Sequence, residues 1–401
     1  MSGFSRIFLD KNILAVLFTI MVSLNHIGFI PTIPSYYAAA FALLCVFVIL
    51  NHGECYYELK SGLFLLFLPF TILLAQPDSV FQSWLRLAVY TAFFAIGSPL
   101  IQSNYARQFR SDSLITVCCF CVFIGVGSFI AYFLGYSAQA ERAIAQGIDT
   151  DLYDVGRFSG IAQQSMSLGP LSGIGAMVFI YLALVKQNKW FYLGAIPCIG
   201  SVMFSASRSA FVATIAGGLF ILYKFSTSKE ELVKYLVTAF VCGMLTFPVW
   251  SGAMSGLAAK QASHRNDKEL FDSRSEKFGY RIKEFASSPI WGVGFSAIDP
   301  HIGDRFNRKR GVIEPGSSWL AILSMTGLVG FILFFRMYKQ SYDIMKTSDE
   351  QISVLLVAVF ILISVHMMAE GYVFATGNPL CYYVALFIGC GYDLVFKQEE
   401  S

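Results

Sequence analysis

Long apolar runs, separated by short polar stretches, make up most of this 401-residue chain. About twelve of these runs approach the ~20 residues that a helix needs to cross a lipid bilayer. They lie near 13–31, 35–50, 61–76, 82–101, 113–135, 163–185, 190–206, 209–225, 233–251, 316–338, 351–369 and 379–396. The pattern predicts an all-α, polytopic membrane protein, and an even number of spans places both chain ends on the same side of the membrane.

Composition supports a membrane protein. The chain is 56% hydrophobic and only 14% charged, with a mean hydropathy of +0.60, whereas soluble domains carry roughly 25% charged residues. The first residues, MSGFSRIFLDKN, lead into an apolar run that no small-residue cleavage site follows. We therefore expect a first membrane helix here rather than a signal peptide that is removed.

Lysine and arginine set the expected orientation. The short loops near 32–34, 77–81 and 370–378 contain neither residue. The alternate segments contain Arg6, Lys11, Lys60, Arg107, Arg110, Lys186, Lys189, Lys224, Lys229, Lys234, Arg336, Lys339, Lys346 and Lys397. Because cytoplasmic loops are enriched in basic residues, both termini are predicted to be cytoplasmic.

Two predicted outer loops are long, near 136–162 and 252–315, and the second contains eleven basic residues. Long loops are exempt from the rule that basic residues mark the cytoplasmic side, so these residues do not contradict the predicted topology. Basic residues that face outward next to a membrane indicate an anionic ligand at the outer face. The formal net charge of +3 is too small to indicate nucleic acid as a partner. We divide the chain into N-terminal helices, 1–135, and a core, 136–401, that includes the large loop.

Four outward arginines are candidate ligands for phosphate: Arg157, Arg208, Arg274 and Arg281. A guanidinium presents a rigid fork of donors that matches phosphate oxygens two at a time. Arg208 lies in a turn so short that two spans nearly touch. The alternatives are an interfacial arginine at Arg208 and the solvated face of a surface helix at Arg281.

Further polar groups lie within the apolar runs. Arg86 is about one turn inside the fourth run, where a charge is costly and indicates function unless its side chain extends to the interface. His366 and Glu370 are one helical turn apart in the eleventh run, where they pair with each other or line the same cavity as Arg86. The nine cysteines lack metal-ligand spacing, and no P-loop, HExxH or GxSxG motif occurs.

Four segments, in order, resemble the O-antigen polymerase and O-antigen ligase family of membrane glycosyltransferases. They are RFSGIAQQSMSLG, SRSAFVATIAGG, YRIKEFASSPIWGVGF and GSSWLAILSMTGLVG, and the resemblance covers roughly residues 155–395. It implies a place in the bacterial inner membrane and a GT-C-like fold with one large periplasmic loop. It also implies a donor glycan on undecaprenyl diphosphate, no metal or other cofactor, an acceptor glycan and, for a polymerase, a chain-length regulator as partner.

The resemblance also assigns residues. The family's arginine-to-glycine step matches Arg281 to Gly292 and, more loosely, Arg157 to Gly169, and its turn arginine matches Arg208. These arginines would hold the donor's diphosphate and stabilise its departure. Arg208 and Arg281 are the expected catalytic cations, and Arg157, Arg274, Arg86 and His301 are expected to bind substrate.

Gly316 and Ser317 stand where ligases of this family have His-Asn, so the expected general base is Glu314, with His301 or Asp299 as the next candidates. This departure favours a polymerase, which extends a lipid-linked repeat unit. A ligase, which transfers the polymer to lipid A core, is the alternative. A transporter of lipid-linked oligosaccharide is a third reading, for which a pseudo-repeat and several deep charges would be expected.

Overall fold

The computed structural model describes residues 11–30, 47, 56–145, 158–235, 237–238, 244, 272–303, 306–307, 312–313 and 316–399. Within them the protein is all-α, as predicted, apart from two short antiparallel ribbons. In one ribbon β1 (Tyr56–Tyr57) pairs with β2 (Ile101–Gln102), and in the other β3 (Phe306–Asn307) pairs with β4 (Val312–Ile313).

The helices follow the predicted apolar runs closely. They are α2 (Lys11–Leu24), α4 (Leu59–Ala75), η1 (Ser79–Phe81), α5 (Ser83–Gly97), α6 (Asn104–Phe133), α7 (Ala138–Ala145), α8 (Ser165–Val185), α9 (Trp190–Phe204), α10 (Arg208–Phe225), α12 (Asp272–Ser287), α13 (Ser318–Thr347), α14 (Gln351–Met367) and α15 (Leu380–Glu399). The predicted runs near 35–50 and 233–251 fall almost wholly outside the described residues.

Length and composition identify the membrane helices. Five of the described segments are long and apolar enough to cross a bilayer, and five shorter apolar helices accompany them. This is the pattern of a multi-pass membrane protein, but the predicted number of twelve spans is not established. The shorter helices fall below the ~20 residues of a straight span.

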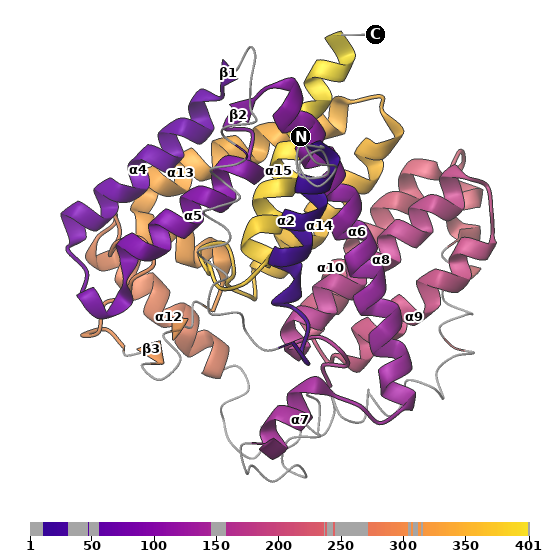
Figure 1. Ribbon diagram of the computed structural model, residues 1–401, viewed down its shortest axis with the longest axis horizontal. Coiled ribbons are helices and arrows are strands. Elements are labelled where there is room, and N and C mark those ends of the chain that lie inside the picture. Colours follow the sequence, from indigo (N-terminus) through magenta and orange to yellow (C-terminus); the bar gives the residue numbers. More distant parts are fainter. Residues whose placement is uncertain are drawn as a thin grey trace, which may run out of the picture.

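The apolar helices alternate in direction from α4 to α10 and again from α13 to α15, so the connections gather at two ends of the bundle (Figure 1). We call one the α12 end, because α7 and α12 lie there, and the opposite one the β1–β2 end. Helices α2, α4, α6, α9 and α14 finish at the α12 end, and α5, α8, α10, α13 and α15 begin there. The chain therefore brings the turns before Arg86, Arg208 and Ser318 to one end.

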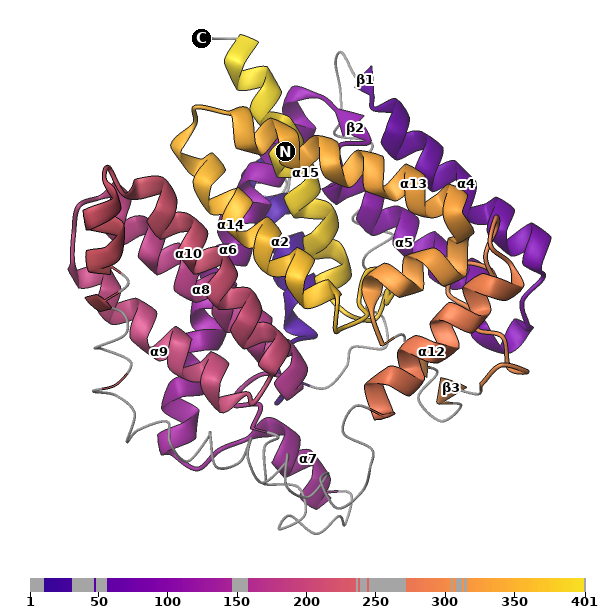
Figure 2. The same cartoon turned by 180° about the vertical axis from the view of Figure 1, so that it is seen from behind.

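The helices pack as two groups joined by a central set (Figures 1 and 2). Helices α4, α5, α12 and α13 form one group, α6, α8, α9 and α10 form the other, and α2, α14 and α15 lie between them. Glycines allow the closest approaches: a Cβ atom added to Gly217 of α10 would lie 2.6 Å from the Ala358 carbonyl oxygen of α14.

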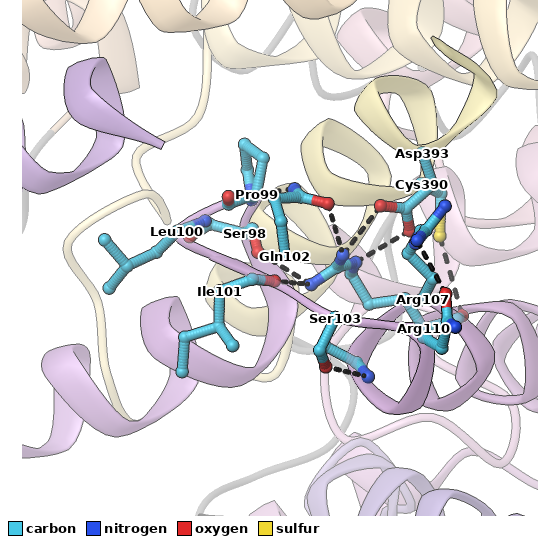
Figure 3. Close-up of polar contacts among 12 residues, drawn as sticks. Ser98, Pro99, Leu100, Ile101, Gln102, Ser103, Arg107, Arg110, Cys390 and Asp393 are labelled. Atoms are coloured by element: carbon cyan, nitrogen blue, oxygen red, sulfur yellow. Dashed lines mark hydrogen bonds and ion pairs between the residues drawn. The ribbon is translucent and has the colours of Figure 1, made fainter. Parts of the chain in front are cut away.

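Helix α6 begins at Asn104, well before the predicted start near 113, because its charged first turns are buried in an ion pair. Arg110 is fully buried and meets the Asp393 carboxylate at 2.6 and 2.7 Å. The same guanidinium donates to the carbonyls of Ser98 at 3.1 Å and Ile101 at 3.0 Å (Figure 3). A paired and hydrogen-bonded guanidinium tolerates burial that an isolated charge does not.

Candidate functional site

The α13 helix is broken near its beginning, at the α12 end of the bundle. Gly327 has φ 64° and ψ −170°, which interrupts the helix between residues 326 and 328. A break of this kind removes the helical partners of carbonyl groups before it and of N–H groups after it. Inside a membrane protein these groups need other partners, because lipid supplies none.

The segment 288–299, which follows α12 and which we call the docking segment, supplies those partners. It makes four main-chain hydrogen bonds across the break: Val293 N to Ser324 O (2.9 Å), Gly294 N to Met325 O (3.1 Å), Leu328 N to Pro289 O (2.8 Å) and Val329 N to Ile290 O (3.4 Å). This part of the predicted large loop is therefore packed against the broken helix.

Two glycines make this approach possible. Gly292 has φ +77°, and a Cβ atom there would lie 2.4 Å from the Met325 carbonyl carbon. A Cβ atom on Gly327 would lie 2.2 Å from the Ile290 carbonyl oxygen. Both positions require glycine because of backbone conformation and space. The glycine of the Arg281-to-Gly292 step thus has a structural reason, which is the docking of one backbone on another.

Arg281 lies in α12, which precedes the docking segment in the chain, and is fully buried. Its Nη1 atom donates to Glu284 Oε2 at 2.8 Å and to Ser324 Oγ at 3.0 Å. The other oxygen of Glu284, which is also fully buried, accepts from the main-chain N–H of Asp299 at 3.2 Å. This ion pair ties α12 to α13 and to the far end of the docking segment.

Glu284 and Ser324 were not among the predicted site residues. Arg281 and Glu284 are three residues apart, which places both side chains on one face of a helix. This spacing could have indicated the ion pair from the sequence. Ser324 lies 43 residues beyond Arg281 in the chain, and no local pattern connects the two.

Arg86 contacts the docking segment from the other side. It lies in the first turn of α5, as predicted, and its half-buried guanidinium donates from Nη1 to Ser296 Oγ at 3.2 Å. A cavity of about 510 Å³ lies at the connection from α4 to α5, where residues that include Gln76, Gln82 and Trp84 line it, but Arg86 is not one of its lining residues. The structure therefore brings Arg86 and Arg281 to one segment.

Arg208 is the first residue of α10 and is exposed. Ser207 caps the helix by accepting from Ala210 N, and only three residues separate α10 from the end of α9, which confirms the short turn. Within the described part of the chain, the Arg208 guanidinium makes no hydrogen bond or ion pair. A free guanidinium at a helix N-terminus favours an anion through its charge and through the helix dipole.

The segment that follows Arg157 lies against the Arg208 turn. The Phe158 ring meets Phe204, the last residue of α9, with centroids 6.1 Å apart. A Cβ atom on Gly169 would lie 2.5 Å from the Cβ atom of Ala210. The two predicted motifs are thus neighbours in space, and Arg157 itself lies outside the described residues.

The beginning of α13 contacts the end of α14. Ser317 caps α13 and donates to Met367 O at 3.1 Å, and Ser318 Oγ donates to Glu370 O at 2.8 Å. Gly316 has φ +75°. Gly316 and Ser317, the two residues predicted to stand in place of a His-Asn pair, therefore build the turn into α13.

Helix geometry places Arg208 beside this region. Gly217 touches Ala358 where α10 and α14 run antiparallel. Arg208 and Met367 are each nine residues, or about 13 Å, from that contact toward the α12 end. His366 and Glu370 are buried nearby, and the His366 ring stacks on Tyr372 with centroids 5.6 Å apart.

The remaining predicted site residues are less informative. His301 is exposed in a turn, where its main-chain N–H donates to Asp299 Oδ1 at 3.0 Å. Arg274 belongs to α12, but its side chain is outside the described part, as is Glu314. Among the described residues, no three His, Cys, Asp or Glu side chains form a group that could hold a metal ion.

Comparison with known proteins identifies one region. Residues 193–335 match a protein family model described as O-Antigen ligase. The match begins within α9 and includes the Arg208 turn, Arg281, the docking segment and the break in α13. A search of curated proteins found no match.

Proposed function

Residues 193–335 form an O-antigen ligase family domain, and from this premise we propose that the protein is a membrane glycosyltransferase that polymerises a surface polysaccharide. The donor is a glycan on undecaprenyl diphosphate, and the acceptor is another lipid-linked repeat unit. The α12 end faces the periplasm, and both termini are cytoplasmic. The observation that carries the proposal is the gathering of Arg86, Arg208 and Arg281 at one end of an apolar helix bundle.

Arg208 is the proposed ligand of the donor's diphosphate. The acceptor hydroxyl attacks the anomeric carbon, the bond to the bridging oxygen breaks, and the polyprenyl diphosphate leaves with the bonding electrons. Negative charge develops on that oxygen, so a preorganised cation stabilises the transition state more than the ground state. Arg208 suits this role because it is exposed and free of protein partners within the described residues.

Arg281 acts at a different point. Its buried contacts with Glu284 and Ser324 support a positioning role, in which it fixes the docking segment and thereby Ser296 and Arg86. Arg86, half-buried beside that segment, is the proposed second cation for the diphosphate. Arg157 and Arg274 are proposed to assist from the segments that precede α8 and open α12.

The proton of the acceptor hydroxyl needs a base. Glu314 remains the proposed one, with His301 and Asp299 as alternatives. In this chain Gly316 and Ser317 form the turn and cap of α13. Neither residue has an imidazole, so these positions lack the histidine base that is expected of a ligase. This supports a polymerase. The description of the matching family favours the second candidate, an O-antigen ligase that transfers finished polymer to lipid A core.

Gene deletion with complementation separates these functions. Loss of a polymerase leaves single repeat units on the acceptor, seen as loss of the ladder on a polysaccharide gel. Loss of a ligase leaves bare core while polymer accumulates on undecaprenyl diphosphate. A transporter would instead leave the lipid-linked unit on the cytoplasmic leaflet, out of reach of an added periplasmic glycosidase, and this result would overturn the proposal.

A further inference from the structure

The connection from α4 to α5 forms the cavity of about 510 Å³ at the α12 end of the bundle (Figure 1). Small-molecule sites have volumes of this order and combine apolar walls with a few polar groups. Here apolar side chains of both helices occur together with the polar side chains of Gln76, Asp78, Gln82 and Ser83 and with the indole of Trp84. The mechanism proposed above uses none of these side chains.

Two glutamines at this connection have an unusual backbone conformation. Gln76, with φ 46° and ψ 54°, follows α4, and Gln82, with φ 51° and ψ 40°, follows η1. Both are left-handed, a conformation that glycine adopts without the cost that a side chain adds. Where a larger residue persists at such a position, its side chain is a candidate for function.

A third glutamine with the same conformation provides a comparison. Gln187, with φ 51°, follows α8 at the β1–β2 end, and its own Nε2 donates to Leu184 O at 2.8 Å. The side-chain amides of Gln76 and Gln82 make no hydrogen bond with a described residue. Each amide has two N–H donors and one carbonyl acceptor, so both can bond to a ligand.

Two more polar groups at the cavity have unused hydrogen-bonding capacity. Ser83 is only 5% exposed, and its Oγ atom has no partner among the described residues. The Asp78 carboxylate accepts through Oδ1 from Val80 N at 3.0 Å and from Ser79 Oγ at 3.5 Å, whereas its Oδ2 atom bonds to no described residue. A buried hydroxyl without a hydrogen bond is costly, and a ligand that bonds to it removes that cost.

Trp84 adds a flat apolar surface beside these polar groups. Its side chain is 53% exposed, and its ring contacts no described aromatic ring. A tryptophan of this kind at the end of a membrane helix can serve as an interfacial anchor. The unpartnered amides, hydroxyl and carboxylate oxygen at the same cavity favour a ligand instead.

Charge decides the class of that ligand. Asp78 is the single charged residue among the described residues that line the cavity, and no lysine or arginine is among them. A phosphate is therefore disfavoured. A sugar ring is neutral, its hydroxyls donate to a carboxylate and exchange hydrogen bonds with amides, and its C–H face can pack on the negative face of an indole.

We propose that this cavity binds one sugar ring of the lipid-linked glycan. The ring packs on Trp84, and its hydroxyls bond to the side chains of Gln76, Gln82 and Asp78. The subsite rests on the proposed function, because it names where the transferase holds the glycan of its substrate.

The docking segment places the cavity close to Arg86, the proposed second cation for the diphosphate. Phe295 N donates to Thr71 Oγ1 of α4 at 3.0 Å, and Arg86 of α5 donates to Ser296 Oγ at 3.2 Å. One segment thus holds both helices that form the cavity. Arg86 is two residues from Trp84, so a glycan whose diphosphate lies at Arg86 has its first sugars within reach of the indole.

Equilibrium binding of two ligands to the full-length protein in detergent tests the subsite. One ligand is the lipid-linked repeat unit extracted from a strain that lacks this gene, and the other is undecaprenyl diphosphate, which has no sugar. We expect Trp84→Ala, and the double variant Gln76→Gly and Gln82→Gly, to raise the Kd of the repeat unit by about tenfold. The Kd of undecaprenyl diphosphate should not change.

Matched controls separate binding from folding. Gln187→Gly and Trp190→Ala change the same residue types at the opposite end of the bundle, where Trp190 is 77% exposed at the start of α9. Both controls should bind both ligands as the wild type does. The double glycine variant should keep or raise its unfolding temperature, since glycine relieves the left-handed strain.

The possible failures can be told apart. Variants that bind the repeat unit as tightly as the wild type would overturn the subsite and leave the proposed function intact. A wild-type protein that binds neither ligand would contradict the proposed function, and the subsite with it. Stabilisation by phosphatidylethanolamine in nanodiscs that Trp84→Ala abolishes would identify a phospholipid as the occupant and would overturn the sugar subsite.

Discussion

Arg281 and Ser324 meet at 3.0 Å, although 43 residues separate them in the chain. Their contact fixes α12 against the last intact turn of α13 before its break. The main-chain carbonyl of the same Ser324 accepts from Val293 N of the docking segment. One serine thus joins the buried arginine and the docked backbone, so disturbance of either one disturbs the other.

Glu284→Gln tests the positioning role of Arg281. The substitution leaves a buried guanidinium without its counter-charge, and removal of one partner of a buried ion pair typically costs about 3–5 kcal/mol. We expect the thermal unfolding temperature and the transferase activity to fall together, as they should in Arg281→Ala. Glu276→Gln is the control, because Glu276 is an exposed carboxylate on the same helix. Normal stability of Glu284→Gln would argue against the positioning role.

Alanine substitutions at Gly292 and Gly327 test the docking of the segment on α13. Each backbone has positive φ, which costs an L-residue roughly 1–2 kcal/mol before any steric overlap. The overlap with main-chain atoms at 2.4 and 2.2 Å cannot be relieved by side-chain rotation. We expect loss of stability and activity in both variants. Gly279→Ala, where a Cβ atom meets nothing within 4 Å, should leave both unchanged or improve stability slightly.

Arg208→Ala tests the proposed diphosphate ligand. The side chain is exposed and has no partner among the described residues, so the free energy of unfolding should change by no more than about 0.5 kcal/mol. Loss of one preorganised donor to the leaving oxygen should reduce kcat by about 10²–10³-fold. Lys224→Ala at the opposite end of α10 is the matched control. A well-expressed Arg208→Ala enzyme that makes a full ladder would remove Arg208 from the site.

Asp393→Ala tests the ion pair at the β1–β2 end. The Arg110 guanidinium is fully buried, so loss of its partner should cost about 3–5 kcal/mol of stability. Asp343→Ala breaks the exposed pair of Lys339 and Asp343, whose side chains are 59% and 51% exposed, and should cost less than about 1 kcal/mol. Thermal unfolding of the two variants in detergent measures the difference. If the two variants lost similar amounts of stability, the buried Arg110 guanidinium would not depend on its partner more than an exposed cation does.

The positions of most apolar helices along the chain could be predicted from the sequence. The apolar runs correspond to helices wherever the structure describes them, because a segment buried in lipid must satisfy its main-chain groups internally. The order and direction of those helices also place Arg86, Arg208 and Arg281 at one end of the bundle, and the exposure of that end to the periplasm stays a prediction. These features depend on local hydrophobicity and on the order of segments, both of which the sequence contains directly.

The break in α13 was not predicted. The run near 316–338 is continuously apolar, and Gly327 within it resembles any small residue of a membrane helix. A break is stable there because the docking segment supplies hydrogen bonds to the main-chain groups that the break exposes. This segment lies about thirty to forty residues earlier in the chain, so no local pattern indicates it. The early start of α6 was missed for a similar reason, since Asp393 lies 283 residues from Arg110.

The sequence by itself determined which of the described segments are apolar helices and which family the core resembles. Tertiary structure decided what each arginine does. Arg208 and Arg281 have the same side chain and were predicted to have the same role, but one is exposed at a helix start and the other is sealed against Glu284 and Ser324. Burial and pairing depend on neighbours that are distant in the chain, and those neighbours meet only when the protein has folded.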